Sequence, residues 1–363
     1  MGHHWKENWA RTAEHFKRWW HHEGLVVTAP CAIRHDPPRI DEEEPPPRSR
    51  EEYFLDNAYR IRRRHWQLAR MEFPLDNLPI ADTDFGPGAF GTYLGAEPKI
   101  APNTIWYEHC WGDVPDPRGL KLPPLEPPNR WYQLALDLLR ETKKVAADNY
   151  FTGFPDLIEH VDTLAALRDP QTLMMDMALY PDWVESMLIE LNKLWFKVYD
   201  TMYDIIREPD GSSVFQAFSL WAPGKTAKIQ CDNAAMISPA MFRRFVVPRL
   251  REQCQFLDYS MFHLDGPDCL CHVDALLEIE ELDAIEWTPG PKVPRGGDLH
   301  WKELYRRILD AGKSVQIVWV EESNIRPLLD TLGPKGLYLC LCTRLENWDD
   351  VERIETILAP YGY

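Results

Sequence analysis

The chain has 363 residues, 45% of them hydrophobic, and a formal net charge of -17. This composition excludes an intrinsically disordered protein and is typical of a globular chain with a large core. The negative charge excludes nucleic acid as a ligand, because binding to a phosphate backbone needs a basic surface. No run of about 18 apolar residues occurs, so no membrane partner is expected.

The amino-terminal residues and the cysteines indicate a cytoplasmic protein. Residues 1–18 are polar and charged and lack the apolar core of a signal peptide. The 8 cysteines are scattered and form no repeated C-x-x-C framework. Reduced thiols in the cytoplasm are therefore expected.

The first half of the chain predicts long helices separated by irregular segments. A strand is expected within residues 24–33, and another in 76–93, where it runs into the glycine-rich turn Asp84-Phe85-Gly86-Pro87-Gly88. Residues 1–72 are expected to be a decoration of helices and a loop that packs on residues 73–363, the two parts together forming one structural domain. The helices predicted in this half are 5–23, 49–71, 130–149 and 181–207.

The second half alternates strands and helices. Its strands are near-continuous apolar runs, as expected where helices cover a parallel sheet. The predicted strands are 213–220, 228–231, 260–265, 284–287, 314–320 and 336–342. The predicted helices are 238–257, 269–279, 299–311, 325–332 and 348–358. Because no G-x-G-x-x-G follows a strand, an open dinucleotide-binding sheet is disfavoured. The pattern favours an α/β fold of the (β/α)8 TIM-barrel class, with its site at the carboxyl ends of the strands.

Two short motifs carry the chemistry of this sequence. His263 and Asp265 alternate onto one face of a strand, and so do Cys340 and Cys342 at the end of another. Imidazole, carboxylate and thiolate together form a plausible zinc set with one position open to a substrate. The alternative is structural: a turn at Asp265 and two small core thiols.

The other expected strand ends collect aromatic and acidic residues. Aromatic walls with a few convergent polar groups are typical of a small-molecule pocket, although each residue also has an ordinary packing role. We expect a substrate pocket formed by Trp221, Asp232, Trp287, Trp319, Glu321 and Tyr338. Asp84, which shares a face with Asp82, is a further catalytic candidate. Without metal, His263 and Asp265 can act as an acid/base pair. A nucleophilic Cys342 is a weaker alternative, since no elbow motif surrounds it.

Several segments, taken in order, resemble the uroporphyrinogen decarboxylase superfamily, which includes corrinoid-linked methyltransferases. The resemblance covers residues 73–358. The matching segments are Asp84-Phe85-Gly86-Pro87-Gly88, Leu94-Gly95, Thr104-Ile105-Trp106, Leu167-Arg168-Asp169-Pro170 with Asp176, Cys231-Asp232, Met236-Ile237-Ser238-Pro239 and His263-Leu264-Asp265-Gly266.

The resemblance implies a barrel whose methyltransferase branch binds zinc through an H-x-C motif and a later cysteine. His263 matches the histidine, Asp265 stands where that branch has its first cysteine, and Cys340 or Cys342 lies near the second, with Cys231 in reserve. The carboxylate would shift the metal preference toward oxygen substrates. A corrinoid would have to sit on a separate protein. The oligomeric state stays open, a homodimer being ordinary.

Three functions are carried forward from the sequence. The first is zinc-dependent methyl transfer from a small O- or N-methylated substrate. The second is a metal-free decarboxylase or other lyase. It is disfavoured because residues 60–64 are interpreted as a solvated helix face and not as the arginine motif of the decarboxylase. The third is a barrel that binds a small molecule without turning it over.

Overall fold

The computed structural model describes residues 4–86, 88–101 and 105–363. Pro87 and Thr104, which belong to two of the motifs above, lie outside the described residues, as does part of the polar amino-terminal segment. Among the described residues, no helix is both long and apolar enough to cross a membrane.

Six parallel strands form the central sheet, in the order β1-β12-β11-β10-β9-β8. The strands are β1 (Leu25–Thr28), β8 (Thr226–Gln230), β9 (Tyr259–Asp265), β10 (Ala284–Thr288), β11 (Ser314–Val320) and β12 (Leu337–Leu341). The predicted mixed α/β fold with a parallel sheet is confirmed.

A second parallel pair, β2 (Ile80–Ala81) with β5 (Phe151–Thr152), lies beyond β1. Asp76 N donates to Val27 O at 2.9 Å next to β1, and Phe154 N donates to Val214 O at 2.7 Å on the far side of the pair. These links are local. Among the described residues, no continuous ladder of strands closes the sheet into a ring.

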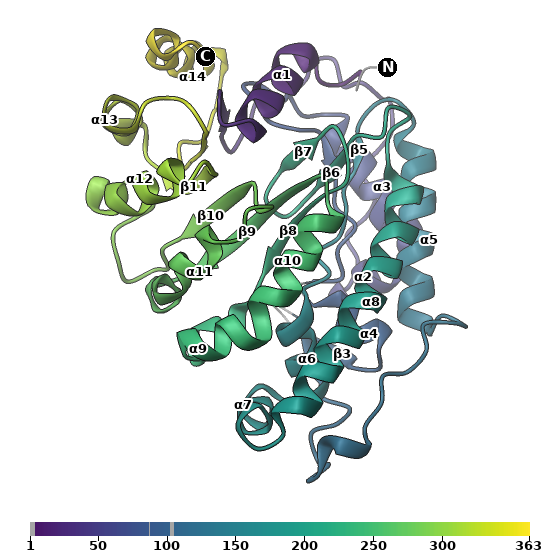
Figure 1. Cartoon of the computed structure of the whole chain (residues 1–363). Coiled ribbons are helices and arrows are strands. Elements are labelled where there is room, and N and C mark those ends of the chain that lie inside the picture. The colour runs from purple at the N-terminus through teal and green to yellow at the C-terminus, as the bar shows by residue number, and fades with distance from the viewer. Residues whose placement is uncertain (1–3, 87, 102–104) are drawn as a thin grey trace.

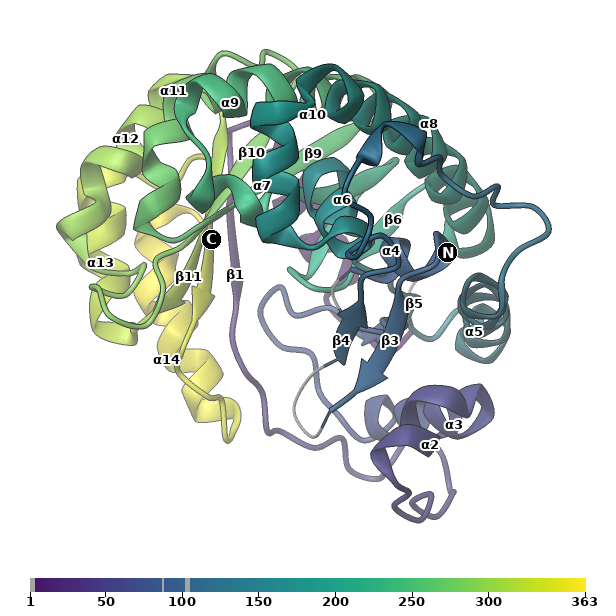
Figure 2. The same cartoon turned by 90° about the horizontal axis from the view of Figure 1, so that it is seen from below.

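Helices cover the outer side of the curved sheet, as Figures 1 and 2 show. The helices are α1 (Trp9–Trp20), α2 (Arg50–Leu55), α3 (Asn57–Leu68), α4 (Ala89–Tyr93), α5 (Arg130–Ala146), α6 (His160–Arg168), α7 (Pro170–Leu179), α8 (Pro181–Ile206), α9 (Pro239–Met241), α10 (Val247–Phe256), α11 (Val273–Leu277), α12 (Lys302–Asp310), α13 (Glu322–Leu332) and α14 (Trp348–Leu358).

Helix α1 covers the amino ends of the strands. Trp19 Nε1 donates to Gly336 O at 3.2 Å, and Ser314 Oγ donates to Trp19 O at 2.5 Å, directly before β12 and at the start of β11. Strand β1 follows α1 and pairs with β12. The segment 1–72 therefore supplies one strand of the central sheet besides its helices.

Two predicted elements are divided in the structure. The predicted strand 213–220 is an antiparallel hairpin of β6 (Ser213–Phe215) and β7 (Leu220–Ala222), because Ser219 takes a left-handed backbone (φ 51°) that reverses the chain. The predicted helix 49–71 breaks at Asp56, whose side chain accepts from Tyr59 N and so begins a new helix. A hairpin of β3 (Glu97–Ile100) and β4 (Ile105–Glu108) was not predicted.

Candidate active site

A row of polar side chains crosses the inner face of the central sheet. Gln230, His263, Glu286, Gln316 and Tyr338 stand opposite one another on five neighbouring strands. Since side chains alternate along a strand, residues two positions further on point the same way. The residues that follow this row therefore extend the same polar face toward the carboxyl ends of the strands.

Three of these side chains can hold a metal ion. Asp232, His263 and Asp265 place their ligand atoms within 4.8 Å of one another. Two carboxylates and one imidazole suit divalent cations that accept oxygen ligands, zinc among them. Among the described residues, this is the one group of at least three possible metal ligands whose ligand atoms lie close together.

Glu286 fixes the orientation of the His263 ring. A carboxylate can only accept, so Nδ1 of His263 donates to Glu286, and Nε2 is left for a metal or a substrate. Thr288 Oγ1 donates to the other Glu286 oxygen at 2.6 Å. A second ring nitrogen bonded to a buried carboxylate is a usual feature of histidine metal ligands. Burial opposes the charged form of His263, but the bond and charge of Glu286 outweigh it, and the pKa is raised.

Asp232 lies at the mouth of the site, two residues after the end of β8. Its side chain reaches water, yet the surrounding protein desolvates it, and the charge of Asp162 adds to that effect. Together they raise the Asp232 pKa to about 6. Asp162 itself accepts from Asp232 N at 2.7 Å and from the Asn233 side chain at 2.6 Å. The site thus gathers more negative charge than it neutralises, which favours a bound cation.

A second acidic group lies beside the first. Asp84 accepts from Asp156 N at 2.7 Å and from Gln216 Nε2 at 2.6 Å. Burial, with the charges of Asp156 and Asp82, raises the pKa of Asp84 well above its usual value. Asp156 in turn pairs with the fully buried Lys228 at 2.6 Å. Asp84 therefore releases its proton less readily than an ordinary aspartate, which suits the role of an acid catalyst.

Arg60 corrects the interpretation of residues 60–64 as a solvated face. Arg60 is only 3% exposed, and its Nη2 donates to Asp84 O at 2.5 Å. Arg64 donates to Ile80 O at 2.6 Å. Both guanidinium groups hold the backbone around β2, on the side of the helix that faces the sheet.

A cavity of about 470 Å³ opens beside the metal-ligating group. Its walls include Trp319, Tyr338, Cys340 and Cys342, four of the residues expected at the site. Phe218, from the β6–β7 turn, connects the cavity with the ligands: it lines the cavity, and its ring lies 5.0 Å from that of His263.

The structure does not bring the two thiols into the metal-ligating group. Cys340 lies opposite Thr28, on a strand three positions away from the strand of His263, roughly 14 Å along the sheet at ~4.8 Å per strand. Arg295 Nη1 donates to the Cys342 sulfur at 3.6 Å. Burial raises the pKa of both thiols, that of Cys340 to about 12. The prediction that the thiols lie beside His263 required their strands to be neighbours. The order of strands in a sheet cannot be read from spacing along the chain.

Besides Asp232, three expected pocket residues lie outside this cavity. Trp221 is buried in β7, where it accepts from Trp20 Nε1 through its backbone oxygen at 2.8 Å. Trp287 is fully buried, and its ring packs 4.8 Å from that of Trp301. Glu321 is exposed and forms an ion pair with Arg295 at 3.1 Å. The two tryptophans are thus core residues, and Glu321 lies on the rim.

The sequence interpretation missed Lys228, Glu286 and Gln316. Each is a polar residue in the interior of a strand and is itself buried. A buried polar residue at such a position needs a partner. That signal was present in the sequence, but only the register shows that Glu286 faces His263.

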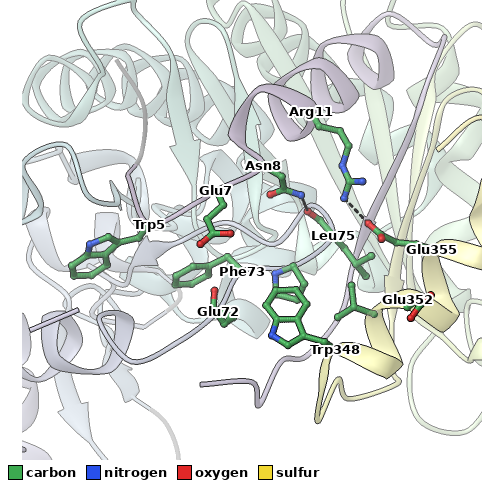
Figure 3. A pocket seen from close by; sticks show the side chains of 12 residues that line it. Trp5, Glu7, Asn8, Arg11, Glu72, Phe73, Leu75, Trp348, Glu352 and Glu355 are labelled. Atoms are coloured by element: carbon green, nitrogen blue, oxygen red, sulfur yellow. Dashed lines mark hydrogen bonds and ion pairs between the residues drawn. The ribbon is translucent and has the colours of Figure 1, made fainter. Parts of the chain in front are cut away.

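A different cavity, of about 350 Å³, lies where α1 meets α14 (Figure 3). Trp348 and Phe73 line it, and Arg11 bonds to Glu355 across it at 2.7 Å. It holds none of the candidate catalytic residues, and we assign the candidate site to the carboxyl ends of the strands.

Comparison with known proteins supports the fold. Neither the family models nor the curated proteins include a match to this chain. Among solved structures, a methyltransferase from Methanosarcina mazei is similar at a TM-score of 0.53 and 11% sequence identity, over 76% of this chain and 78% of that chain. At this identity the likeness shows a shared fold: a parallel α/β sheet wrapped by helices.

Proposed function

We propose that the chain is a metal-dependent, methyltransferase-like enzyme. Its fold would be a (β/α)8 barrel of the uroporphyrinogen decarboxylase superfamily, and its substrate a small O- or N-methylated molecule. The single observation that carries the proposal is the convergence of Asp232, His263 and Asp265 beside a cavity of small-molecule size. The fold shared with a methyltransferase supports the same class.

The side chains of the site have different roles in this proposal. A divalent cation, zinc in the first instance, would supply Lewis acidity toward a substrate oxygen. Glu286 holds the imidazole of His263 in place, and Phe218 packs against the imidazole ring. Asp84 can hold a proton for a leaving group. The methyl acceptor would be a thiol or a corrinoid carried by a separate protein.

Metal content tests the proposal first. We expect about one zinc per chain in protein purified without a histidine tag. His263→Ala and Asp232→Asn should lose it, whereas Cys342→Ala should keep it because this thiol lies outside the ligand group. Protein that binds no zinc, manganese or iron after reconstitution would contradict the proposal. So would a His263→Ala variant with undiminished metal content.

A second candidate is a metal-free lyase that uses Asp84, His263 and Asp265 as acid/base groups. The raised pKa of Asp84 favours it. Turnover that survives exhaustive chelation and is lost in Asp84→Asn would support this alternative over methyl transfer.

A further inference from the structure

The cavity where α1 meets α14 has aromatic walls and several acidic side chains. Its volume is about 350 Å³, which suits a small molecule, and it shares no residue with the candidate active site. Its aromatic walls are Trp5, Phe73 and Trp348. The charged residues that line it are Glu7, Arg11, Glu72, Glu352 and Glu355. Carboxylates thus outnumber cationic groups around the cavity, which favours a cationic ligand.

Two of these carboxylates have no counter-charge in the protein. Glu7 and Glu352 form no ion pair with any described residue, whereas the other two glutamates pair with Arg11 at 2.7 Å and with Arg39 at 3.3 Å. Nζ of the buried Lys6 donates to two backbone oxygens, each at 2.7 Å, and pairs with neither carboxylate. Burial also lowers the pKa of Lys6 to about 7, so its charge is partly lost at neutral pH.

A cation of the protein itself already uses part of these walls. The Arg39 guanidinium lies 5.8 Å from the ring centre of Trp5 and 5.9 Å from that of Phe73, and it bonds to Glu72. Rings and a carboxylate hold it together, which is the usual arrangement for a bound organic cation. The third ring, that of Trp348, is 55% exposed, and no side-chain cation of the described residues covers it.

We propose that this cavity binds a small alkyl diammonium ion. One ammonium group pairs with Glu7 and the other with Glu352, and the methylene chain between them packs against Trp348. In the view of Figure 3, the Trp348 side chain lies between the side chains of the two glutamates. Val351 adds apolar surface to the same wall. The bound ion links the segment before α1 to the last long helix, and the site is independent of the proposed function.

Binding of three probes of matched length to the full chain tests the inference, by calorimetry at low ionic strength. We expect 1,5-diaminopentane to bind at one molecule per chain and about fivefold more tightly than n-pentylamine, which can pair with only one carboxylate. We expect 1,5-pentanediol, which has no charge, to bind more weakly than either. In Glu352→Gln, which removes one carboxylate at the same length, the diamine should lose its advantage over the monoamine.

Two controls place the binding in this cavity. Asp349→Asn removes the same charge from the first turn of α14 but outside the cavity, and it should keep the preference for the diamine. Asp232→Asn, in the candidate metal site, should keep it as well, which separates this test from that of the proposed function. Equal affinities of the three probes for the wild type, no binding at all, or a preference lost in Asp232→Asn but kept in Glu352→Gln would overturn the inference.

Discussion

At the scale of single residues, Glu286 decides how firmly His263 can hold a metal. It is fully buried, and it bonds to both His263 and Thr288. We expect Glu286→Gln to lower the zinc affinity about tenfold, because the amide supports the ring less strongly than the carboxylate. Competition with a chromophoric chelator measures this affinity. Glu352→Gln, on the exposed side of α14, is the matched control, and equal affinities in both variants would contradict the role of Glu286.

Asp84 makes the stability of the metal-free protein depend on pH. Its pKa in the folded state is raised by burial and by its acidic neighbours. Its stability contribution is therefore complete below the unfolded pKa of about 3.9 and is lost as the pH rises through the folded pKa.

Relative to wild type, the unfolding free energy of Asp84→Asn should rise by about 1 kcal/mol between pH 4 and pH 8. The lost bond to Gln216 changes the difference between the two proteins by the same amount at every pH, so it does not affect this rise. Urea denaturation at a series of pH values measures the difference. Parallel pH profiles for the two proteins would contradict the raised pKa.

At the scale of secondary-structure elements, the irregularity in β11 stores backbone strain at Trp319. Glycine adopts a left-handed backbone without penalty, whereas alanine does not. We expect Trp319→Gly to be about 1 kcal/mol more stable than Trp319→Ala, which reverses the usual order of these residues in a strand. Thermal denaturation of the two variants gives the comparison. An alanine variant as stable as the glycine variant would show that the strain is absent.

The elements differ in how well the sequence predicted them. Strands β9 to β12 are long apolar runs and were predicted within one residue or two at each end. Strands β2 and β5 have two residues each. A pattern that short carries no periodicity, and β5 was missed. The reversal at Ser219 was missed because apolar residues continue through the turn.

The candidate site could be predicted only in part, because the sequence shows the pattern within one strand but not the pairing between strands. Alternation within one strand predicted that His263 and Asp265 share a face, and Asp232 was expected at the same rim. In the structure the ligand atoms of these three residues lie within 4.8 Å of one another. The partners across strands, Glu286 above all, depend on register, which a single sequence does not give. Cys340 and Cys342 lie apart from the metal-ligating group because β12 is three positions away from β9 in the sheet.

At the scale of the whole molecule, the first helix and strand of the chain pack against its last strands. Helix α1 covers the amino ends of the strands, and β1 pairs with β12. We expect deletion of residues 1–24 to abolish cooperative folding, because Tyr338 loses its contacts with Phe16 and Trp19. Near-ultraviolet circular dichroism measures the loss. Trp20→Phe, which removes the hydrogen bond to Trp221 O and part of a buried ring, should cost about 2 kcal/mol and leave the protein folded. A folded truncation would contradict this prediction.

The β6–β7 turn contacts the second acidic group, His263 and the cavity without belonging to the central sheet. Gln216 bonds to Asp82 and Asp84, Phe218 contacts His263, and Ser219 O accepts from Tyr338 at 3.1 Å. Its length and composition can therefore vary while every strand pairing of the central sheet stays the same. Proteins with this architecture can evolve toward new substrates by exchanging a four-residue loop, and a protein engineer can randomise the same loop without rebuilding the scaffold.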